Sequence, residues 1–360
     1  MKIAFILSRC KRSGSSRNVI EVAKYLSEWG HEVHIFANIC DPLVKNVRFH
    51  KIPEISGNYL VRNCLTTVFE TLLMKLYKFD VTVAQPSRYF SPDVCHVRIL
   101  QKIDANRNTI TNVLMRAPER YNLKKSKHII AMSNSIKHDI VKHYGIPESK
   151  ISVIYDGVNL DEFDTRKRSV YCREIKEKLG ISDKNFVLLF AGNPFSRKGL
   201  EFVIRALPHI KKQNTKLLVV GNDNIVPYME VAKRLDVADR IIHVSFTDEI
   251  YKYFATANAF VFPTLYEPFG LVITEAMASG IPVITSASAG AAELIDDGKD
   301  GLLLSNPKNE EEITEKINAL LEGDIAEKLG KAARKKIEQY TWEKTAKDML
   351  KVFEEVSRVK

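Results

Sequence analysis

The sequence lacks any long hydrophobic run. A membrane-spanning helix needs about 18 or more mostly apolar residues, and no segment of the 360-residue chain comes near that length. The apolar run at residues 3–7 is followed at once by polar and basic residues, so it is too short for a signal peptide. We therefore expect a cytoplasmic protein without a membrane span.

Cysteine is also scarce. The five cysteines are odd in number, widely spaced and without a C-x-x-C pair; they are Cys10, Cys40, Cys64, Cys95 and Cys172. A disulfide framework or a zinc site needs paired or clustered cysteines. The spacing therefore predicts isolated, reduced thiols.

The residues that are present suit a packed chain of two domains. Hydrophobic residues make up 45% of the sequence and charged residues 27%, so disorder is not expected. A length of 360 residues fits two domains of about 150–200 residues each. No low-complexity segment or short tandem repeat is present.

Short apolar runs alternate with helical patterns along both halves. This alternation predicts parallel sheets covered by helices, in two doubly wound α/β domains. The predicted strands are 3–7, 32–37, 80–84, 128–131, 151–154, 186–190, 216–220, 240–243, 259–262 and 282–285. The predicted helices include 17–29, 135–144, 200–210, 228–235, 271–279 and 310–321. A turn signal at Asp156-Gly157 and the polar stretch after it place the boundary within 156–183, dividing the chain into domains 1–165 and 166–340.

The strongest chemical signal follows the predicted strand 259–262. Glu267 lies in the loop after that strand, and Glu275 lies eight positions later in the next helix. Gly270 permits close approach of a ligand to the backbone. The first N–H groups of the helix, on Gly270, Leu271 and Val272, have no partner within it and favour a phosphate oxygen. On spacing alone, a helix start shaped by Pro-Phe-Gly with no ligand is equally compatible.

Glu267 and Glu275 together form the E-x7-E pattern of retaining glycosyltransferases, and the residues around them resemble glycosyltransferase family 4. The segment Phe-Ala-Gly-Asn-Pro-Phe-Ser-Arg-Lys-Gly at 190–199 resembles the glycine loop and Arg-Lys pair of that family. Gly-His-Glu-Val at 30–33 and the segment 289–301 resemble two further family elements. The resemblance implies the GT-B fold, α/β with two Rossmann-like domains facing across a cleft. It also implies an N-terminal acceptor-binding domain, a C-terminal donor-binding domain, and a last helix, about 341–360, that packs back on the first domain.

The resemblance assigns roles to the residues of the second domain. Arg197 and Lys198 would hold the diphosphate of the donor, because fixed cations stabilise the charge that develops on a leaving diphosphate. Glu267 would contact the hydroxyls of the sugar, and Glu275 those of the ribose. The remaining implied donor-binding residues are Gly192, Asn193, Phe269, Gly270, Leu271 and Val272. The donor is expected to be a UDP-sugar. The chain has no suitable D-x-D motif, and the family implies metal-independent, retaining transfer without a cofactor.

The first domain carries a less specific signal. The segment 8–16 follows the first strand and contains one glycine, Gly14, where many family members have two. The resemblance gives Gly14 and Arg17 a donor-side role and makes His96, with Arg98 beside it, a candidate near the transferred sugar. The segment 80–85 fits the same kind of strand, so the alignment at His96 is ambiguous, and a lone histidine is often structural.

The charge distribution bears on the acceptor. Residues 1–165 contain 24 Lys and Arg against 16 Asp and Glu, which is +8 of the net +10. This excess is compatible both with an anionic, membrane-linked acceptor and with ordinary solvated surface charge, and no nucleic-acid partner is expected. The first half loosely resembles lipopolysaccharide core α-1,3-glucosyltransferases, which implies UDP-glucose as donor and the inner membrane face. The apolar helix predicted at 59–78 is interpreted as packed in the core, with peripheral membrane contact as the alternative.

Two other functions fit the same sequence. A GT-B sugar-nucleotide epimerase would share the fold and the UDP site but would need no acceptor. A non-catalytic protein that binds a nucleotide sugar or a polyanion would use the basic half without turnover. Product analysis of a UDP-sugar incubated with and without acceptors separates the three.

Overall fold

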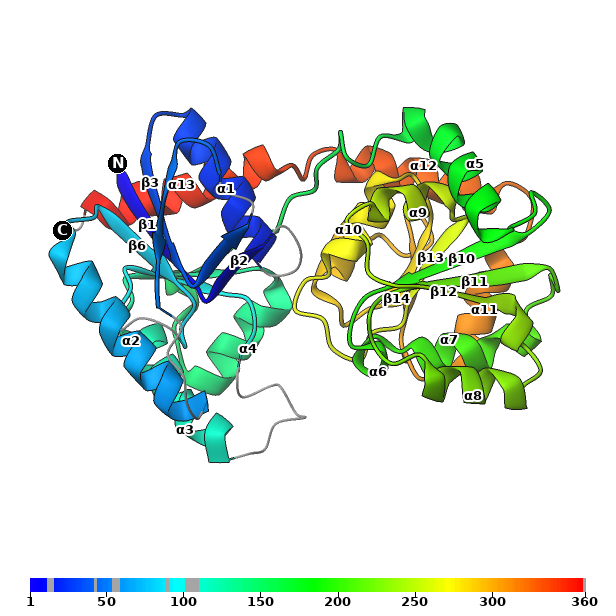
Figure 1. Cartoon of the computed structure of the whole chain (residues 1–360), viewed down its shortest axis with the longest axis horizontal. Coiled ribbons are helices and arrows are strands. Elements are labelled where there is room, and N and C mark those ends of the chain that lie inside the picture. The colour runs from blue at the N-terminus through cyan, green and yellow to red at the C-terminus, as the bar shows by residue number, and fades with distance from the viewer. Residues whose placement is uncertain (12–15, 42–43, 54–58, 88–90, 101–109, 359–360) are drawn as a thin grey trace. The chain divides into compact units, whose positions relative to one another are not determined.

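The computed structural model describes residues 1–11, 16–41, 44–53, 59–87, 91–100 and 110–358. The chain forms two compact units (Figure 1). Unit 1 contains Met1–Gly157 and Trp342–Lys360, and unit 2 contains Val158–Thr341. The chain therefore divides at Gly157, at the turn signal, whereas the predicted boundary is at residue 165.

Unit 1 is built on a parallel sheet of seven strands. Its order is β5-β3-β1-β6-β7-β8-β9. The strands β1, β3 and β5 follow one another toward one edge of the sheet, and β6 to β9 follow one another toward the other edge. The central strands β1, β6 and β7 are mostly apolar and buried, because both faces of the sheet are covered there. The seven strands are β1 (Lys2–Ile6), β3 (Glu32–Ala37), β5 (Val47–Lys51), β6 (Val81–Ala84), β7 (Val94–Val97), β8 (His128–Ala131) and β9 (Ile151–Val153), and a separate ribbon pairs β2 (Arg9–Lys11) with β4 (Ile39–Asp41).

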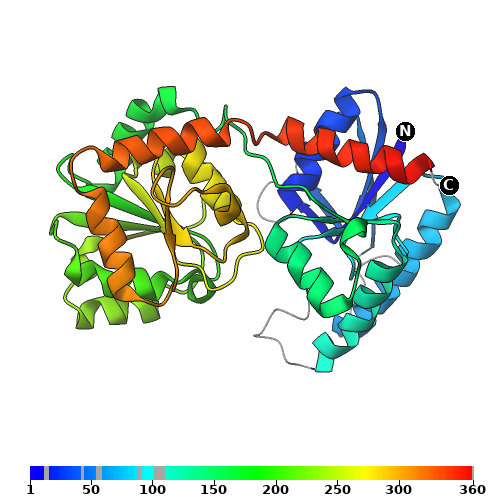
Figure 2. The same cartoon turned by 180° about the vertical axis from the view of Figure 1, so that it is seen from behind.

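The last helix of the chain completes the core of unit 1. Ala346, Met349 and Phe353 are buried among side chains of the central strands, and the ring of Phe353 meets that of Phe5 edge-on at 6.1 Å. Figure 2 shows this helix, in red, running alongside the sheet. The helices of unit 1 are α1 (Arg17–Glu28), α2 (Tyr59–Leu76), α3 (Ile110–Lys125), α4 (Asn134–Tyr144), the short η2 (Glu148–Lys150) and α13 (Trp342–Arg358).

Unit 2 repeats the plan with six parallel strands in the order β12-β11-β10-β13-β14-β15. They are β10 (Phe186–Ala191), β11 (Thr215–Val220), β12 (Ile241–Val244), β13 (Ala259–Phe262), β14 (Val283–Ser286) and β15 (Leu302–Leu304). The α-helices are α5 (Arg168–Leu179), α6 (Phe195–Lys198), α7 (Leu200–Ala206), α8 (Val226–Arg234), α9 (Ile250–Thr256), α10 (Leu271–Ala278), α11 (Glu310–Leu320) and α12 (Ile325–Ile337). Short 3-10 turns are η3 (Thr165–Lys167), η4 (Leu207–His209), η5 (Ala238–Arg240) and η6 (Gly290–Leu294). Helix α5 lies inside the segment 156–183, for which the sequence predicted a domain boundary and no helix. The prediction is wrong for this part of the segment.

Helix α2 has an apolar exposed face and a mixed buried face. Its buried positions include the polar Thr66, Thr67 and Glu70, and the apolar Met74, which packs in the core of unit 1. The exposed positions form an apolar face, which we call the α2 face, made of Leu65, Val68, Phe69, Leu72 and Leu76. The prediction that this helix packs its apolar side into the core is therefore wrong for these five residues. Among the helices of the described segments, none has the length and hydropathy needed to cross a membrane.

The ribbon of β2 and β4 brings together two cysteines that are far apart in the sequence. Cys10 and Cys40 are directly opposite each other in its parallel register, and their thiols are hydrogen-bonded. The prediction of isolated thiols is therefore wrong for this pair. A register between two three-residue strands carries too little pattern to be predicted from the sequence.

Candidate functional site

The predicted site residues fall into two groups, one in each unit. Each group lies where the strand order of its sheet reverses, between β1 and β6 in unit 1 and between β10 and β13 in unit 2. Ligands of open parallel sheets bind beyond the carboxyl ends of the strands at this reversal. In unit 2, the loop after β10 carries Arg197 and Lys198, and the loop after β13 carries Glu267.

Lys198 and Glu267 form an ion pair and a hydrogen bond in unit 2. The side chains of Lys198 and Glu267 are 8% and 13% exposed, so little water reaches the pair. Burial lowers the pKa of Lys198 from its ordinary value, and the charge of Glu267 opposes that change. The ammonium also lies 5.2 Å from the centre of the Phe262 ring. Because little water screens the ammonium of Lys198, it interacts strongly with an incoming anion.

Arg197 ties the two loops together through its backbone. Its carbonyl accepts hydrogen bonds from the N–H of Leu265 at 2.8 Å and the hydroxyl of Thr264 at 3.2 Å. Its guanidinium donates from Nη1 to the carbonyl of Tyr266 at 3.2 Å. The next residue, Gly199, has φ +80°, and a Cβ there would lie 2.1 Å from the carbonyl oxygen of Pro263. The close contact of the two loops, which brings Lys198 to Glu267, therefore requires a glycine after the Arg-Lys pair.

Helix α10 begins directly after Gly270. This glycine has φ +105°, and a Cβ on it would lie 3.0 Å from Cγ of Glu267 and 2.9 Å from Ile273. Within the described chain, no hydrogen bond uses the backbone N–H of Gly270, Leu271 or Val272. These N–H groups and the helix dipole favour an anion.

Three other predicted residues of unit 2 lie near this centre. Glu275 is on the second turn of α10 and is 7% exposed. Gly192 has φ +146° and lies against Lys198, whose Cγ would be 3.5 Å from a Cβ at this position. Phe269 is 1% exposed, so its ring belongs to the core and only its backbone can meet a ligand.

The predicted residue Asn193 is engaged within the protein. Its side-chain oxygen accepts from the backbone N–H groups of Asn222 at 3.0 Å and Asp223 at 3.1 Å. Asp223 in turn accepts from the N–H of Phe195 at 2.7 Å and caps the start of α6. Asp223 is not recognisable from the sequence, because a single carboxylate after a strand has no characteristic spacing.

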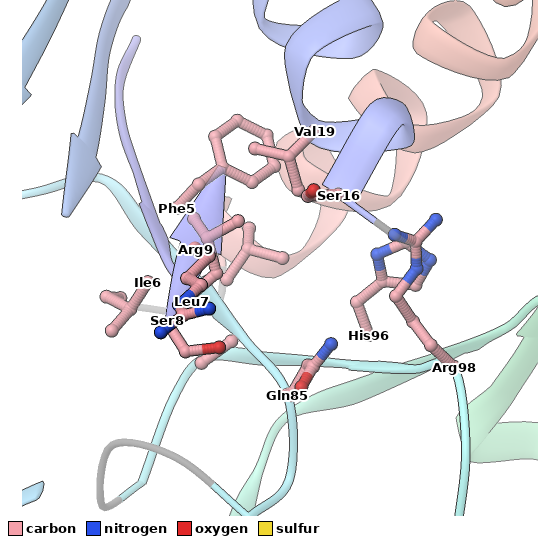
Figure 3. Close-up of a pocket in the computed structure, with 12 residues that line it drawn as sticks. Phe5, Ile6, Leu7, Ser8, Arg9, Ser16, Val19, Gln85, His96 and Arg98 are labelled. Carbon is pink, nitrogen blue, oxygen red and sulfur yellow. The ribbon is translucent and has the colours of Figure 1, made fainter. Parts of the chain in front are cut away.

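Unit 1 has a pocket of about 100 Å³ at the corresponding place in its sheet (Figure 3). Its walls come from the ends of β1, β6 and β7 and the start of α1. The lining residues are Phe5, Ile6, Leu7, Ser8, Arg9, Ser16, Val19, Val83, Ala84, Gln85, His96 and Arg98. His96 and Arg98, which the sequence analysis placed side by side, both contribute to this pocket.

A buried ion pair supports one wall of the pocket. Nη2 of Arg98 donates to Oδ2 of Asp156 at 3.1 Å, and the amide of Asn18 donates to the other carboxylate oxygen. Burial lowers the pKa of Arg98 and raises that of Asp156, so the attraction between them offsets desolvation only in part. Nε and Nη1 of Arg98 are buried without a partner in the described chain. The roles of Asp156 and Asn18 are not recognisable from the sequence, because Asp156-Gly157 has the pattern of an ordinary turn.

His96 is neutral at pH 7. It is 4% exposed on β7, and burial, followed by the charge of Arg98, holds its pKa well below the ordinary 6.5. Arg17 is the first residue of α1 and lies 3.7 Å from the carboxylate of Glu21. Gly14 lies outside the described residues. Within the described segments, no three His, Cys, Asp or Glu side chains gather as metal ligands would.

Two family models match the chain, one in each unit. Residues 12–162 match Glycosyltransferase Family 4, and residues 172–336 match Glycosyl transferases group 1. The uncharacterized glycosyltransferase MJ1607 of Methanocaldococcus jannaschii is 32% identical over 243 residues, which cover 66% of this chain and only 62% of that relative. The lipopolysaccharide glucosyltransferase WaaG of Escherichia coli is 25% identical over 328 residues, which cover 86% of each chain.

Solved structures show the same fold. The crystal structure of WaaG superimposes with a TM-score of 0.84 at 22% identity and covers 98% of this chain and 99% of that one. The structure of Anabaena HepE in complex with UDP and glucose gives a TM-score of 0.81 at 19% identity, with 98% and 99% covered. Both family models describe glycosyltransferases and together span most of both units. The chain therefore belongs to glycosyltransferase family 4 and has the GT-B fold.

Proposed function

We propose that the protein transfers a hexose, with glucose as our first choice, from a UDP-sugar to an anionic glycan or glycolipid, such as a lipopolysaccharide core. The observation that carries this proposal is the buried pair Lys198–Glu267 beside the open N–H groups of α10. The binding of UDP and glucose by HepE and the lipopolysaccharide glucosyltransferase activity in the name of WaaG support this choice.

The donor would be held by charge and by backbone dipoles. Lys198 and Arg197 supply cations for the diphosphate, and the first N–H groups of α10 donate to its oxygens. Lys198 would move from Glu267 toward the leaving diphosphate as negative charge develops there. Glu267 is then available to accept from sugar hydroxyls, and Glu275 to accept from those of the ribose. These protein groups would meet the charge of the diphosphate without a metal ion or another cofactor.

The proposed transfer retains the anomeric configuration. The acceptor hydroxyl attacks the sugar from the face that the diphosphate leaves, and its proton passes to a phosphate oxygen of the leaving group. The sugar–oxygen bond to the diphosphate breaks as the bond to the acceptor forms. No protein nucleophile is required, so Glu267 and Glu275 act by binding and orientation. This differs from retaining hydrolases, in which a carboxylate attacks the sugar.

The acceptor would be recognised by unit 1. Arg98 lines the pocket with Gln85 and the neutral imidazole of His96, and its Nε and Nη1 have no hydrogen-bond partner in the part of the chain that the structure describes. A phosphate or carboxylate group accepts such hydrogen bonds from a guanidinium in a planar, two-pronged geometry. The excess of basic residues in the first half of the sequence adds long-range attraction for the same acceptor.

Membrane contact is part of the proposal and is carried by the α2 face. Five apolar side chains are exposed there, and Leu72 and Leu76 are 58% and 80% exposed. An exposed apolar helix face of this kind binds at the boundary between headgroups and acyl chains. We propose that the protein works at the inner face of a membrane, where a lipid-linked acceptor is presented.

A donor panel tests the function directly. The full-length protein is heated with each of several UDP-sugars and with GDP- and ADP-sugars, and its midpoint of unfolding is measured. A preferred UDP-sugar should raise the midpoint through mass action. The same donor is then incubated alone and with lipopolysaccharide-core acceptors, and the products are separated. Transfer only with acceptor supports the proposal, an isomerised UDP-sugar without acceptor supports an epimerase, and binding without any product supports a non-catalytic role.

A further inference from the structure

The β2–β4 ribbon carries a pair of thiols that the proposed transfer does not use. Cys10 and Cys40 are partners in the parallel register, between the pairs Arg9–Ile39 and Lys11–Asp41. Both cysteines are reduced, and their side chains share a hydrogen bond. Opposed residues on adjacent strands are about 4.8 Å apart, within the roughly 4.4–6.8 Å between Cα atoms that a disulfide accepts. The register therefore places the Cα atoms of the two cysteines within the range that a disulfide spans.

The two thiols differ in exposure and in acidity. Cys10 is completely buried, whereas Cys40 is half-buried and reachable from solvent. The thiol of Cys10 donates to the sulfur of Cys40, which lowers the pKa of Cys40 and raises that of Cys10. A reachable sulfur with thiolate character is the one that attacks small disulfides. The buried thiol of Cys10 is shielded from small disulfides, so its reaction partner is the neighbouring sulfur of Cys40.

We propose that Cys10 and Cys40 are a dithiol site that low-molecular-weight disulfides oxidise to a bond between β2 and β4. The thiolate of Cys40 attacks one sulfur of the small disulfide, forms a mixed disulfide and releases one thiolate. The sulfur of Cys10 then attacks the sulfur of Cys40, and its proton passes to the second small thiolate as that thiolate leaves. Two protein thiols are oxidised and one small disulfide is reduced to two thiols, so the exchange balances.

The position of this bond links it to the pocket of unit 1. Ser8 and Arg9 line the pocket, and Cys10 is the next residue along β2. A covalent bond to β4 would fix the segment that forms this wall. We expect oxidation to lower acceptor turnover reversibly, and this consequence alone rests on the proposed function.

Mass mapping of the full-length protein tests the bond without an activity assay. The reduced protein is incubated with oxidised glutathione, alkylated and digested. We expect an internal disulfide that joins the peptides of Cys10 and Cys40, in the wild type and in the control Cys172→Ser. The variant Cys10→Ser should accumulate glutathione on Cys40, and Cys40→Ser should leave Cys10 unmodified. A wild-type protein that carries only glutathione on Cys40, or that bonds Cys10 to another cysteine, would overturn the proposal.

A second measurement needs no variant. Phenylarsine oxide binds two neighbouring thiols at once, so one equivalent should be retained by the reduced wild type and lost after oxidation. Failure to retain the arsenical would contradict the proximity of the two sulfurs. Sugar transfer is then compared before and after oxidation and after dithiothreitol. Equal turnover in all three states, with the bond mapped, would reject control of the pocket, whereas absent turnover in every state would speak against the proposed function instead.

Discussion

Each unit places a buried cation–carboxylate pair beyond the carboxyl ends of its parallel strands, yet the two pairs are built differently. In unit 2, Lys198 and Glu267 come from the loops after the adjacent strands β10 and β13 and retain 8% and 13% exposure. In unit 1, Arg98 follows β7 and pairs with Asp156, which follows β9. The side chains of Arg98 and Asp156 are 4% and 1% exposed. The first pair borders the open start of α10, whereas the second supports the wall of a small pocket.

This difference separates two uses of a buried charge. A pair at the edge of a site can be rearranged, because an anionic ligand can replace the carboxylate as the partner of Lys198. A pair sealed in the interior cannot exchange partners without exposing a charge to a low-dielectric environment. We therefore expect Lys198 to act on the ligand, and Asp156 to act by holding Arg98 in place.

Removal of Arg98 should have the largest effect and tests the sealed pair. The substitution Arg98→Leu leaves Asp156 buried without its cation, and we expect unit 1 to lose about 3–5 kcal/mol of stability. Both tryptophans, Trp29 and Trp342, belong to unit 1, so urea unfolding followed by tryptophan fluorescence reports on this unit.

The double variant Arg98→Leu, Asp156→Leu is the matched control, since it removes both charges. It should recover most of the loss, because two apolar side chains need no pairing. If the single substitution lowers the free energy of unfolding by only about 1 kcal/mol or less, as loss of a surface ion pair does, then water reaches the Arg98–Asp156 pair. The contrast between the two units would then be wrong.

Removal of Lys198 should affect turnover rather than the stability of unit 1. The substitution Lys198→Ala takes a cation from the developing charge of the leaving diphosphate, and we expect kcat to fall about 10²–10³-fold. Tryptophan fluorescence unfolding should be unchanged, because both tryptophans are in unit 1. The control Lys233→Ala removes a lysine of unit 2 that is 63% exposed and should retain full turnover. Equal turnover of Lys198→Ala and the wild type at limiting and saturating donor would reject the assignment.

The sequence predicts the pair of unit 2 far better than the pair of unit 1. Glu267 and Lys198 lie in local motifs that end predicted strands, and the adjacency of those strands follows from the strand–helix alternation. Arg98 and Asp156 are 58 positions apart and lie in no shared motif. Their contact depends on the register of β7, β8 and β9, which no local pattern specifies. The same limit hid the Cys10–Cys40 pair, since the register of a short ribbon is set by the surrounding fold.

The errors on helices have a different physical origin. The sequence did not predict helix α5 because half of its twelve residues are charged and only Ile175 is buried, so the periodic signal is weak. The apolar pattern of α2 was detected correctly, but hydrophobicity does not state which face meets the core. Met74 packs in the core there, but the polar Thr66, Thr67 and Glu70 are buried beside it, against the usual rule for soluble proteins.

A smaller effect is expected on the pH dependence of the stability of unit 1, because unit 1 contains the buried His96. The pKa of His96 is about 6.5 when unfolded and well below that when folded. As pH falls through 6.5, only the unfolded chain binds the proton, so this histidine lowers stability progressively toward acid pH. Relative to His96→Gln, we expect the wild type to lose up to about 1.4 kcal/mol per pH unit below pH 6.5. The other histidines are common to both proteins, so their contributions cancel. Parallel stability curves from tryptophan fluorescence would contradict a buried, neutral His96.

The smallest expected effect concerns the surfaces of the two units. Leu72 on the α2 face is 58% exposed, and Val226 in unit 2 is 60% exposed, so the two form a matched pair for substitution by serine. Neither change should alter stability by more than about 0.5 kcal/mol, because neither residue contributes to a core. On vesicles of phosphatidylethanolamine and phosphatidylglycerol, Leu72→Ser should weaken binding by about 1 kcal/mol, roughly five-fold, while Val226→Ser should bind as the wild type does. Equal binding of both variants would mean that the α2 face does not meet lipid. In that case unit 1 would differ from unit 2 in the construction of its ion pair and pocket, and its apolar face would have no part in presenting a lipid-linked acceptor.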